Sequence, residues 1–323
     1  MKRVYLDQNK WIDFARARTG HPQGEQFRDA YHAALSAADA SQVSFPLSAA
    51  HYFETQRQGS SRRREELADT MLLLSKLTTL APPHMIVPWE IETALIEVFG
   101  LENPTPPPID LYGVGAAHAF ATELATYAAP TEVNGVSLSV EQHALMTLVG
   151  RAIAERSMLS GNGGPDDVRS TVAAHGRRTG DRFVAGQELV RDQLGILGRH
   201  RLNDVMTGTA LGDIATPVIG ACRRLGIDPN DVFGASRETL EKLVFAMPSR
   251  WVEQELRRAR QSNPQQPWAS NDLNDITALA IIIPYCDVVI TERQWVGVIT
   301  TRKINHRFGT TMLRDVRELS YDA

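Results

Sequence analysis

The chain has 323 residues, of which 43% are hydrophobic and 22% are charged, and this composition indicates a globular, soluble protein. The formal net charge of −4 excludes an overall basic field, so any binding of nucleic acid has to depend on local basic clusters. The two cysteines, Cys222 and Cys286, form no CxxC pair, which predicts buried free thiols in a reducing cytoplasm and excludes a cysteine zinc site. The sequence shows no signal peptide and no apolar run of membrane-spanning length, so we expect a cytoplasmic protein with no membrane partner.

The first hundred residues predict strands that alternate with helices. Asp7 or Asn9 is suited to cap the first helix, and Ser48 is suited to cap a later helix that carries His51 and Glu54 on one face. Proline cannot donate to a strand ladder, so we place Pro46 near the end of the second strand. The expected elements are strands at 3–6 and 43–47, helices at 10–18, 24–40, 49 onward, 62–77 and 90–99, and a proline-punctuated loop at 79–88.

The middle of the chain has a different character. Four prolines between residues 104 and 108 predict a boundary, and residues 111–260 show helical patterns with no convincing strand. After a second loop at 263–267, an apolar helix leads into a strand at 288–291, and a last strand follows at 310–313. We therefore predict an α/β fold: a parallel sheet flanked by helices, built from residues 1–102 and 261–323, with an all-helical insertion at 103–260.

Acidic residues stand at the ends of the predicted strands or on adjoining helices. Asp7 and Glu292 each follow a strand, Glu54 lies on a helix, and Asp272 and Asp275 open a helix. A single residue of this kind is ordinarily a helix cap, a dipole partner or a solvated charge. Parallel strands, however, gather such residues at the carboxyl edge of a sheet. Carboxylates that share one cleft repel each other unless a hard divalent cation lies among them.

The pieces that carry this pattern resemble the PIN-domain superfamily of metal-dependent nucleases. They are Val4-Tyr5-Leu6-Asp7-Gln8-Asn9, Pro46-Leu47-Ser48 with Glu54, Asp272-Leu273-Asn274-Asp275-Ile276, and Tyr285-Cys286-Asp287-Val288-Val289-Ile290-Thr291-Glu292. Together they cover roughly the first hundred and last sixty residues. The family commonly has Asp at the position of Glu292, and residues 101–250 have no counterpart in it.

This resemblance implies a nuclease that hydrolyses phosphodiester bonds, in RNA rather than DNA by the family's habit. Water activated on Mg²⁺ or Mn²⁺ would attack the phosphorus. The implied catalytic residues are Asp7, Glu54, Asp275 and Glu292, and the implied metal ligands are Asp7, Asp272, Asp275 and Glu292. Two alternatives stay open: a PIN-like module that binds nucleic acid or protein without cleaving, and another Mg²⁺-dependent hydrolase such as a phosphatase. The second alternative lacks the expected Asp two residues after Asp7, where Asn9 stands.

Basic clusters lie close in sequence to the acidic residues. Two basic clusters supply the predicted nucleic-acid contacts: Arg57, Arg62 and Arg63 belong to the first, and Arg302 and Lys303 belong to the second. A third basic group comprises Arg257, Arg258 and Arg260. Trp268 and Trp295 are candidates for stacking on bases, although packing in the core is the commoner role of tryptophan. RNA is the expected partner, and a second copy of the chain or an inhibitory protein stays open.

Overall fold

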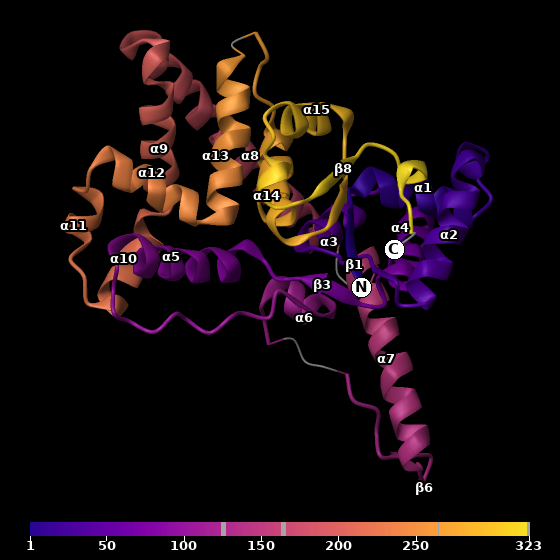
Figure 1. Ribbon diagram of the computed structural model, residues 1–323. Coiled ribbons are helices and arrows are strands. Elements are labelled where there is room, and N and C mark those ends of the chain that lie inside the picture. Colours follow the sequence, from indigo (N-terminus) through magenta and orange to yellow (C-terminus); the bar gives the residue numbers. More distant parts are fainter. Residues whose placement is uncertain (124–126, 163–165, 264, 322–323) are drawn as a thin grey trace. The chain divides into compact units, whose positions relative to one another are not determined.

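The computed structural model describes residues 1–123, 127–162, 166–263 and 265–321. The chain forms two compact units (Figure 1). The first unit comprises Met1–Pro82, Tyr112–Val172 and Leu313–Ala323, and the second comprises Pro83–Leu111 and Ala173–Met312. Each unit is therefore assembled from segments that are far apart in the sequence.

Helices predominate in the first unit. Its elements are β1 (Lys2–Leu6), α1 (Gln8–Arg18), η1 (Pro22–Phe27), α2 (Arg28–Asp39), β2 (Val43–Ser44), α3 (Ala49–Gln56), α4 (Ser61–Ser75), β3 (Thr78–Leu80), β4 (Tyr112–Val114), α6 (Gly115–Phe120), β5 (Glu132–Val133), β6 (Val136–Ser137), α7 (Val140–Ser160) and η4 (Val316–Glu318). Helix α7 packs against α3 and α4.

The second unit is also mainly helical. Its elements are α5 (Pro83–Phe99), η2 (Arg199–Arg201), α9 (Leu202–Gly212), α10 (Ala215–Leu225), α11 (Pro229–Phe233), α12 (Arg237–Ala246), α13 (Pro248–Ser262), α14 (Ser270–Tyr285), β7 (Val288–Ile290), α15 (Arg293–Thr301) and η3 (Asn305–Arg307). Helix α8 (Asp166–Leu197) and strand β8 (Thr311–Leu313) cross from one unit to the other along the chain.

The four strands expected at both chain ends all form, and they make a four-stranded sheet in the order β2-β1-β7-β8. Strand β1 runs parallel to β2, with Lys2 opposite Val43 and Arg3 opposite Ser44. The last three residues of β1 and all of β7 are buried, as expected for strands covered on both faces. The coarse prediction of an α/β fold is confirmed, and the PIN-like arrangement stays a prediction.

The observed units differ from the expected division at 102/103 and 260/261. Helix α5 packs against α10 and α12, and its side chains Ile91, Ala94 and Leu95 belong to the core of the second unit. Helix α7, from the expected insertion, instead packs against α3 and α4 of the first unit. The hydrophobic faces of these helices therefore decide the units, whereas the proline-rich loops do not.

Two local predictions are wrong. The expected insertion is not all-helical, because Tyr112–Val114 forms strand β4, which pairs antiparallel with β3. This pairing supplies partners to backbone groups along an edge of β3. The proline-punctuated loop is also shorter than expected, since α5 begins at Pro83 and includes Pro88. Proline is tolerated at a helix start, and the buried apolar side chains of α5 offset the hydrogen bond that Pro88 cannot donate.

Within the described residues, no single helix has the length and hydropathy needed to cross a membrane. One pair of helical segments, Arg199–Gly212 and Ala215–Leu225, meets that criterion jointly but is bent by 65°.

A carboxylate stabilises the core of the second unit. Glu90 is 2% exposed and accepts hydrogen bonds from the Ser249 backbone N–H at 3.0 Å, from the Ser249 hydroxyl at 2.5 Å and from the Tyr285 hydroxyl at 2.5 Å. Burial raises the pKa of Glu90 above its usual range, and these hydrogen bonds to the carboxylate offset part of that rise. Glu90 therefore ties α5 to α13 and α14.

We expect Glu90→Ala to lower the free energy of unfolding by about 3 kcal/mol, because it leaves a cavity and three hydrogen-bond donors without an acceptor. Tyr285→Phe removes a single hydroxyl and should cost about 1 kcal/mol. Urea denaturation of both variants measures the difference. A loss for Glu90→Ala no larger than for Tyr285→Phe would contradict this role.

Candidate functional site

The five candidate carboxylates divide between the two units. Asp7 and Glu54 belong to the first unit, whereas Asp272, Asp275 and Glu292 belong to the second. The contacts of Asp7 with Gln8, of Asp272 with Arg260 and of Asp275 with Trp295 each lie within one unit.

Asp7 occupies the turn between β1 and α1. It is the N-cap of α1, with extended backbone angles, and its Oδ1 accepts a hydrogen bond from the Gln8 N–H at 2.8 Å. The side chain is half-buried at the carboxyl end of the strand. Asp7 thus has the cap role that a lone aspartate ordinarily has, at the sheet position where α/β proteins place functional groups.

His51, from the first turn of α3, secures the end of β1. Its Nε2 lies 2.9 Å from the Leu6 carbonyl oxygen, and its Nδ1 lies 2.9 Å from the Ser48 backbone nitrogen. A carbonyl can only accept and a backbone N–H can only donate, so Nε2 carries the proton and the imidazole is neutral. The ring is 1% exposed, and burial lowers the pKa of His51 to about 4 despite the opposing bond to Leu6.

A second buried contact joins α1 to α3. The Gln8 side chain donates from Nε2 to the Thr55 hydroxyl at 3.1 Å. Glu54 precedes Thr55 and lies one turn after His51, so both flanking contacts fix the part of α3 that carries Glu54. Glu54 itself is half-buried. The end of β1 and the helix with the second candidate carboxylate are therefore locked together.

In the second unit, Asp272 has a structural role. Its Oδ2 accepts from the Ala269 N–H at 2.8 Å, which caps α14, and it also pairs with the Arg260 guanidinium. Both side chains of this ion pair are almost completely buried. Arg260 also lies over the rings of Trp268 and Trp295, at 5.4 and 5.9 Å from their centroids. These contacts already engage the carboxylate that was predicted as a metal ligand.

Asp275 lies one turn further along α14. Its Oδ2 accepts a hydrogen bond from the Trp295 indole N–H at 2.9 Å, which orients the carboxylate. Glu292 is the N-cap residue of α15 and accepts from the Gln294 side chain at 3.1 Å. Trp295 and Trp268 are 2% and 6% exposed, so both pack in the interior.

The carboxylates suit Mg²⁺ or Mn²⁺ chemically, because both prefer hard oxygen ligands. Among the described residues, no group of three or more His, Cys, Asp or Glu side chains is placed to hold a metal ion. Mg²⁺ is commonly bound by one or two carboxylates together with waters and substrate phosphates, not by an all-protein cage. The carboxylates are therefore chemically suited to such an ion, which would keep coordination positions for water and for substrate phosphates.

The predicted basic residues differ in their surroundings. Arg57, Arg63, Arg302 and Lys303 are exposed, and Arg62 pairs with Glu66 at 2.7 Å. The third basic group is mostly internal, since Arg257 and Arg260 are buried and paired with acidic side chains. Those two arginines are structural and present no surface to phosphates.

Comparison of the chain with known protein families, curated proteins and solved structures gives no match. The resemblance to the PIN-domain superfamily stays a prediction from the residues quoted above. Sequence reasoning also missed Arg16 and His21, which line a cavity in the first unit. The spacing of Ile12, Arg16 and Thr19 along one face of the first helix was the available signal.

The neutral, buried His51 makes stability depend on pH. Its pKa is about 4 in the folded protein and about 6.5 in the unfolded chain, so the unfolded state binds the extra proton between these values. The neutral His51 contributes fully to the free energy of unfolding above pH 6.5. This free energy falls by roughly 3 kcal/mol in total as the pH drops toward 4. Denaturation across this range measures the slope. In His51→Gln the slope should be shallower; an unchanged slope would contradict the assignment.

The two aspartates of α14 should respond differently to the same substitution. Asp272→Asn leaves the buried Arg260 charge uncompensated and should lower the free energy of unfolding by about 3 kcal/mol. Asp275→Asn keeps an oxygen to accept from Trp295, so we expect a cost below about 1 kcal/mol. Thermal and urea unfolding of both variants provide the comparison, and equal losses would refute the distinction.

Proposed function

We propose that the protein is a metal-dependent nuclease that hydrolyses phosphodiester bonds, preferentially in RNA. Asp7, Glu54, Asp275 and Glu292 are the proposed catalytic carboxylates, with Mg²⁺ or Mn²⁺ as the ion. The observation that carries the proposal is the position of Asp7. It stands at the carboxyl end of a buried parallel strand whose last carbonyl is fixed by His51.

The chain's own contacts support this assignment by holding the carboxylates in defined orientations. Asp275 is oriented by the Trp295 indole, a contact of the kind that aligns metal ligands from behind. Glu54 lies on a helix that is tied to β1 through His51 and to α1 through Thr55. A bound ion would lower the pKa of a water and neutralise charge on the phosphoryl oxygens. We assign Asp272 to the cap and ion pair of α14 and not to the metal.

The preference for RNA over DNA rests on the resemblance to the PIN-domain superfamily. An exposed group of arginines near the start of α4 is available for phosphates, as positioning contacts that carry no sequence information. A second copy of the chain or an inhibitory protein remains open as a partner.

A non-cleaving PIN-like binding module is the second candidate. It is favoured by one observation: the described residues contain no group of three metal-ligating side chains. Such a module would bind RNA through its basic residues whether or not a divalent ion is present.

The nuclease proposal predicts stabilisation by the ion. Mn²⁺ or Mg²⁺ at a hundredfold excess over its Kd should stabilise the fold by about 2.7 kcal/mol, which raises the melting temperature. Asp7→Asn and Asp275→Asn should reduce this shift, and each should lower cleavage of a single-stranded RNA by about a hundredfold or more. Calorimetry and a cleavage assay measure the two effects.

Asp228→Asn is the matched control, because Asp228 also caps a helix by accepting a backbone N–H, at the exposed start of α11. It should leave the metal-induced shift and the cleavage rate unchanged. An equal shift in Asp7→Asn and the parent would remove Asp7 from the site. Metal-independent RNA binding with no cleavage would favour the binding module instead.

A further inference from the structure

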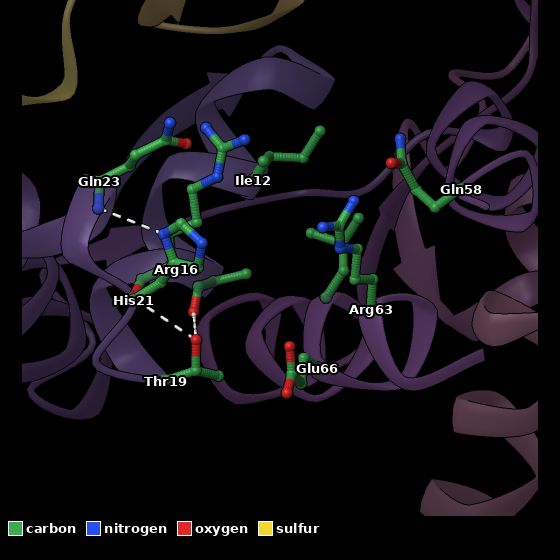
Figure 2. Close-up of a pocket in the computed structure, with 10 residues that line it drawn as sticks. Ile12, Arg16, Thr19, His21, Gln23, Gln58, Arg63 and Glu66 are labelled. Atoms are coloured by element: carbon green, nitrogen blue, oxygen red, sulfur yellow. Dashed lines mark hydrogen bonds between the residues drawn. The ribbon is translucent and has the colours of Figure 1, made fainter. Parts of the chain in front are cut away.

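The first unit contains a cavity of about 310 Å³ between α1, η1 and α4 (Figure 2). This volume exceeds what a single inorganic anion needs and reaches the lower end of small-molecule pockets. None of the candidate carboxylates lines it.

Positive charge predominates in the cavity. Arg16 enters from α1 and Arg63 enters from α4, as Figure 2 shows. Arg16 has a loose ion pair with Asp13 at 3.7 Å, and Arg63 has no ion pair with any residue that the structure describes. The carboxylate that faces them, Glu66, is already paired with Arg62 at 2.7 Å. Two guanidinium groups therefore line the same cavity.

The remaining wall offers neutral hydrogen-bonding groups. His21 Nδ1 accepts from the Gln23 backbone N–H at 3.2 Å, which fixes the ring at the edge of the cavity (Figure 2). The side-chain amides of Gln23 and Gln58 each supply donors and an acceptor. Ile12 and Leu67 add apolar surface. The cavity thus has two arginines at one part of its wall and neutral polar and apolar groups at the rest. This combination matches a molecule that carries both a phosphate and a ring.

The wall formed by η1 is closely packed on α1. A β-carbon at Gly24 would stand 2.2 Å from the Arg16 carbonyl carbon, so only glycine permits this approach. The Gly24 N–H donates to the His21 carbonyl at 2.7 Å, which closes the turn that presents His21 and Gln23. The cavity therefore has a rigid rim on the side of its neutral groups.

We propose that this cavity binds one phosphorylated nucleotide, with the phosphate on Arg16 and Arg63 and the ribose or base against the amides and the apolar surface. Arginine forks suit phosphate oxygens because each can donate two parallel hydrogen bonds. The ligand is either a residue of a strand or a free nucleotide. Its assignment to a strand rests on the proposed nuclease function, for which the cavity would be an anchoring subsite.

The test measures binding to the full chain in EDTA, where no divalent ion contributes. The probes are AMP, adenosine, inorganic phosphate and a short single-stranded RNA. The variant is the double substitution Arg16→Gln with Arg63→Gln. Arg223→Gln is the control, since Arg223 is an exposed arginine on α10 of the second unit that does not line the cavity. Melting temperatures show that the variants are folded.

We expect the parent to bind AMP at least about tenfold more tightly than adenosine or phosphate, and the double variant to lose about tenfold or more. Arg223→Gln should stay within about twofold of the parent. If RNA competes with AMP, and if the double variant also lowers the affinity for RNA, the ligand is a residue of an RNA strand. If AMP binds and RNA does not compete with it, the cavity assignment is supported and the ligand is a free nucleotide.

Four results decide against one proposal or the other. No binding of AMP, or equal affinity in the double variant and the parent, overturns the cavity assignment. Phosphate that binds as tightly as AMP also overturns it, because the nucleoside would then contribute nothing. RNA that binds through the arginines but is never cleaved with Mn²⁺ overturns the nuclease function and leaves the cavity assignment standing.

Discussion

The architecture around Asp7 depends on one buried imidazole. His51 donates to the last carbonyl of β1 and accepts from the backbone N–H of Ser48, so a single side chain joins a strand end to a helix start. Acceptance from Ser48 requires an unprotonated Nδ1 and therefore the neutral ring, and burial of the ring lowers the pKa of His51. Because Leu6 is fixed in this way, the next residue must begin a helix at a defined point. The position of Asp7 is therefore a property of the core and not of a surface loop.

Much of this fold was predictable from local patterns. Continuous apolar runs at residues 4–6 and 288–290 predicted buried strands, and the polar residues that follow or precede them predicted helix caps. The pairing of β4 with β3 could not be predicted, since a run as short as Tyr112–Val114 has no periodicity of its own. The division into units also escaped prediction, because it follows from which helix faces pack together and not from where prolines accumulate.

The residues of the candidate site stay a prediction from the sequence, and their contacts could not be predicted from it. A histidine three residues before a glutamate on a helix resembles a surface pair, and nothing local shows that His51 is buried against Leu6. The partner of Asp272 is Arg260, which lies across a loop that contains two prolines and two glutamines. Arginines likewise have two different roles here. In the second unit Arg257 and Arg260 compensate buried acids, whereas in the first unit Arg16 and Arg63 face a cavity.

The tight approach of η1 to α1 has a consequence for evolution. Arginines and glutamines on a surface can be exchanged for other polar residues over time, but Gly24 cannot gain a side chain while the backbone of Arg16 stays 2.2 Å from its β-carbon position. Any descendant or ancestor that keeps this cavity must keep a glycine there, while the residues that touch a ligand are free to drift with its identity. Among related sequences, that glycine would trace inheritance of the cavity more faithfully than the charges that line it.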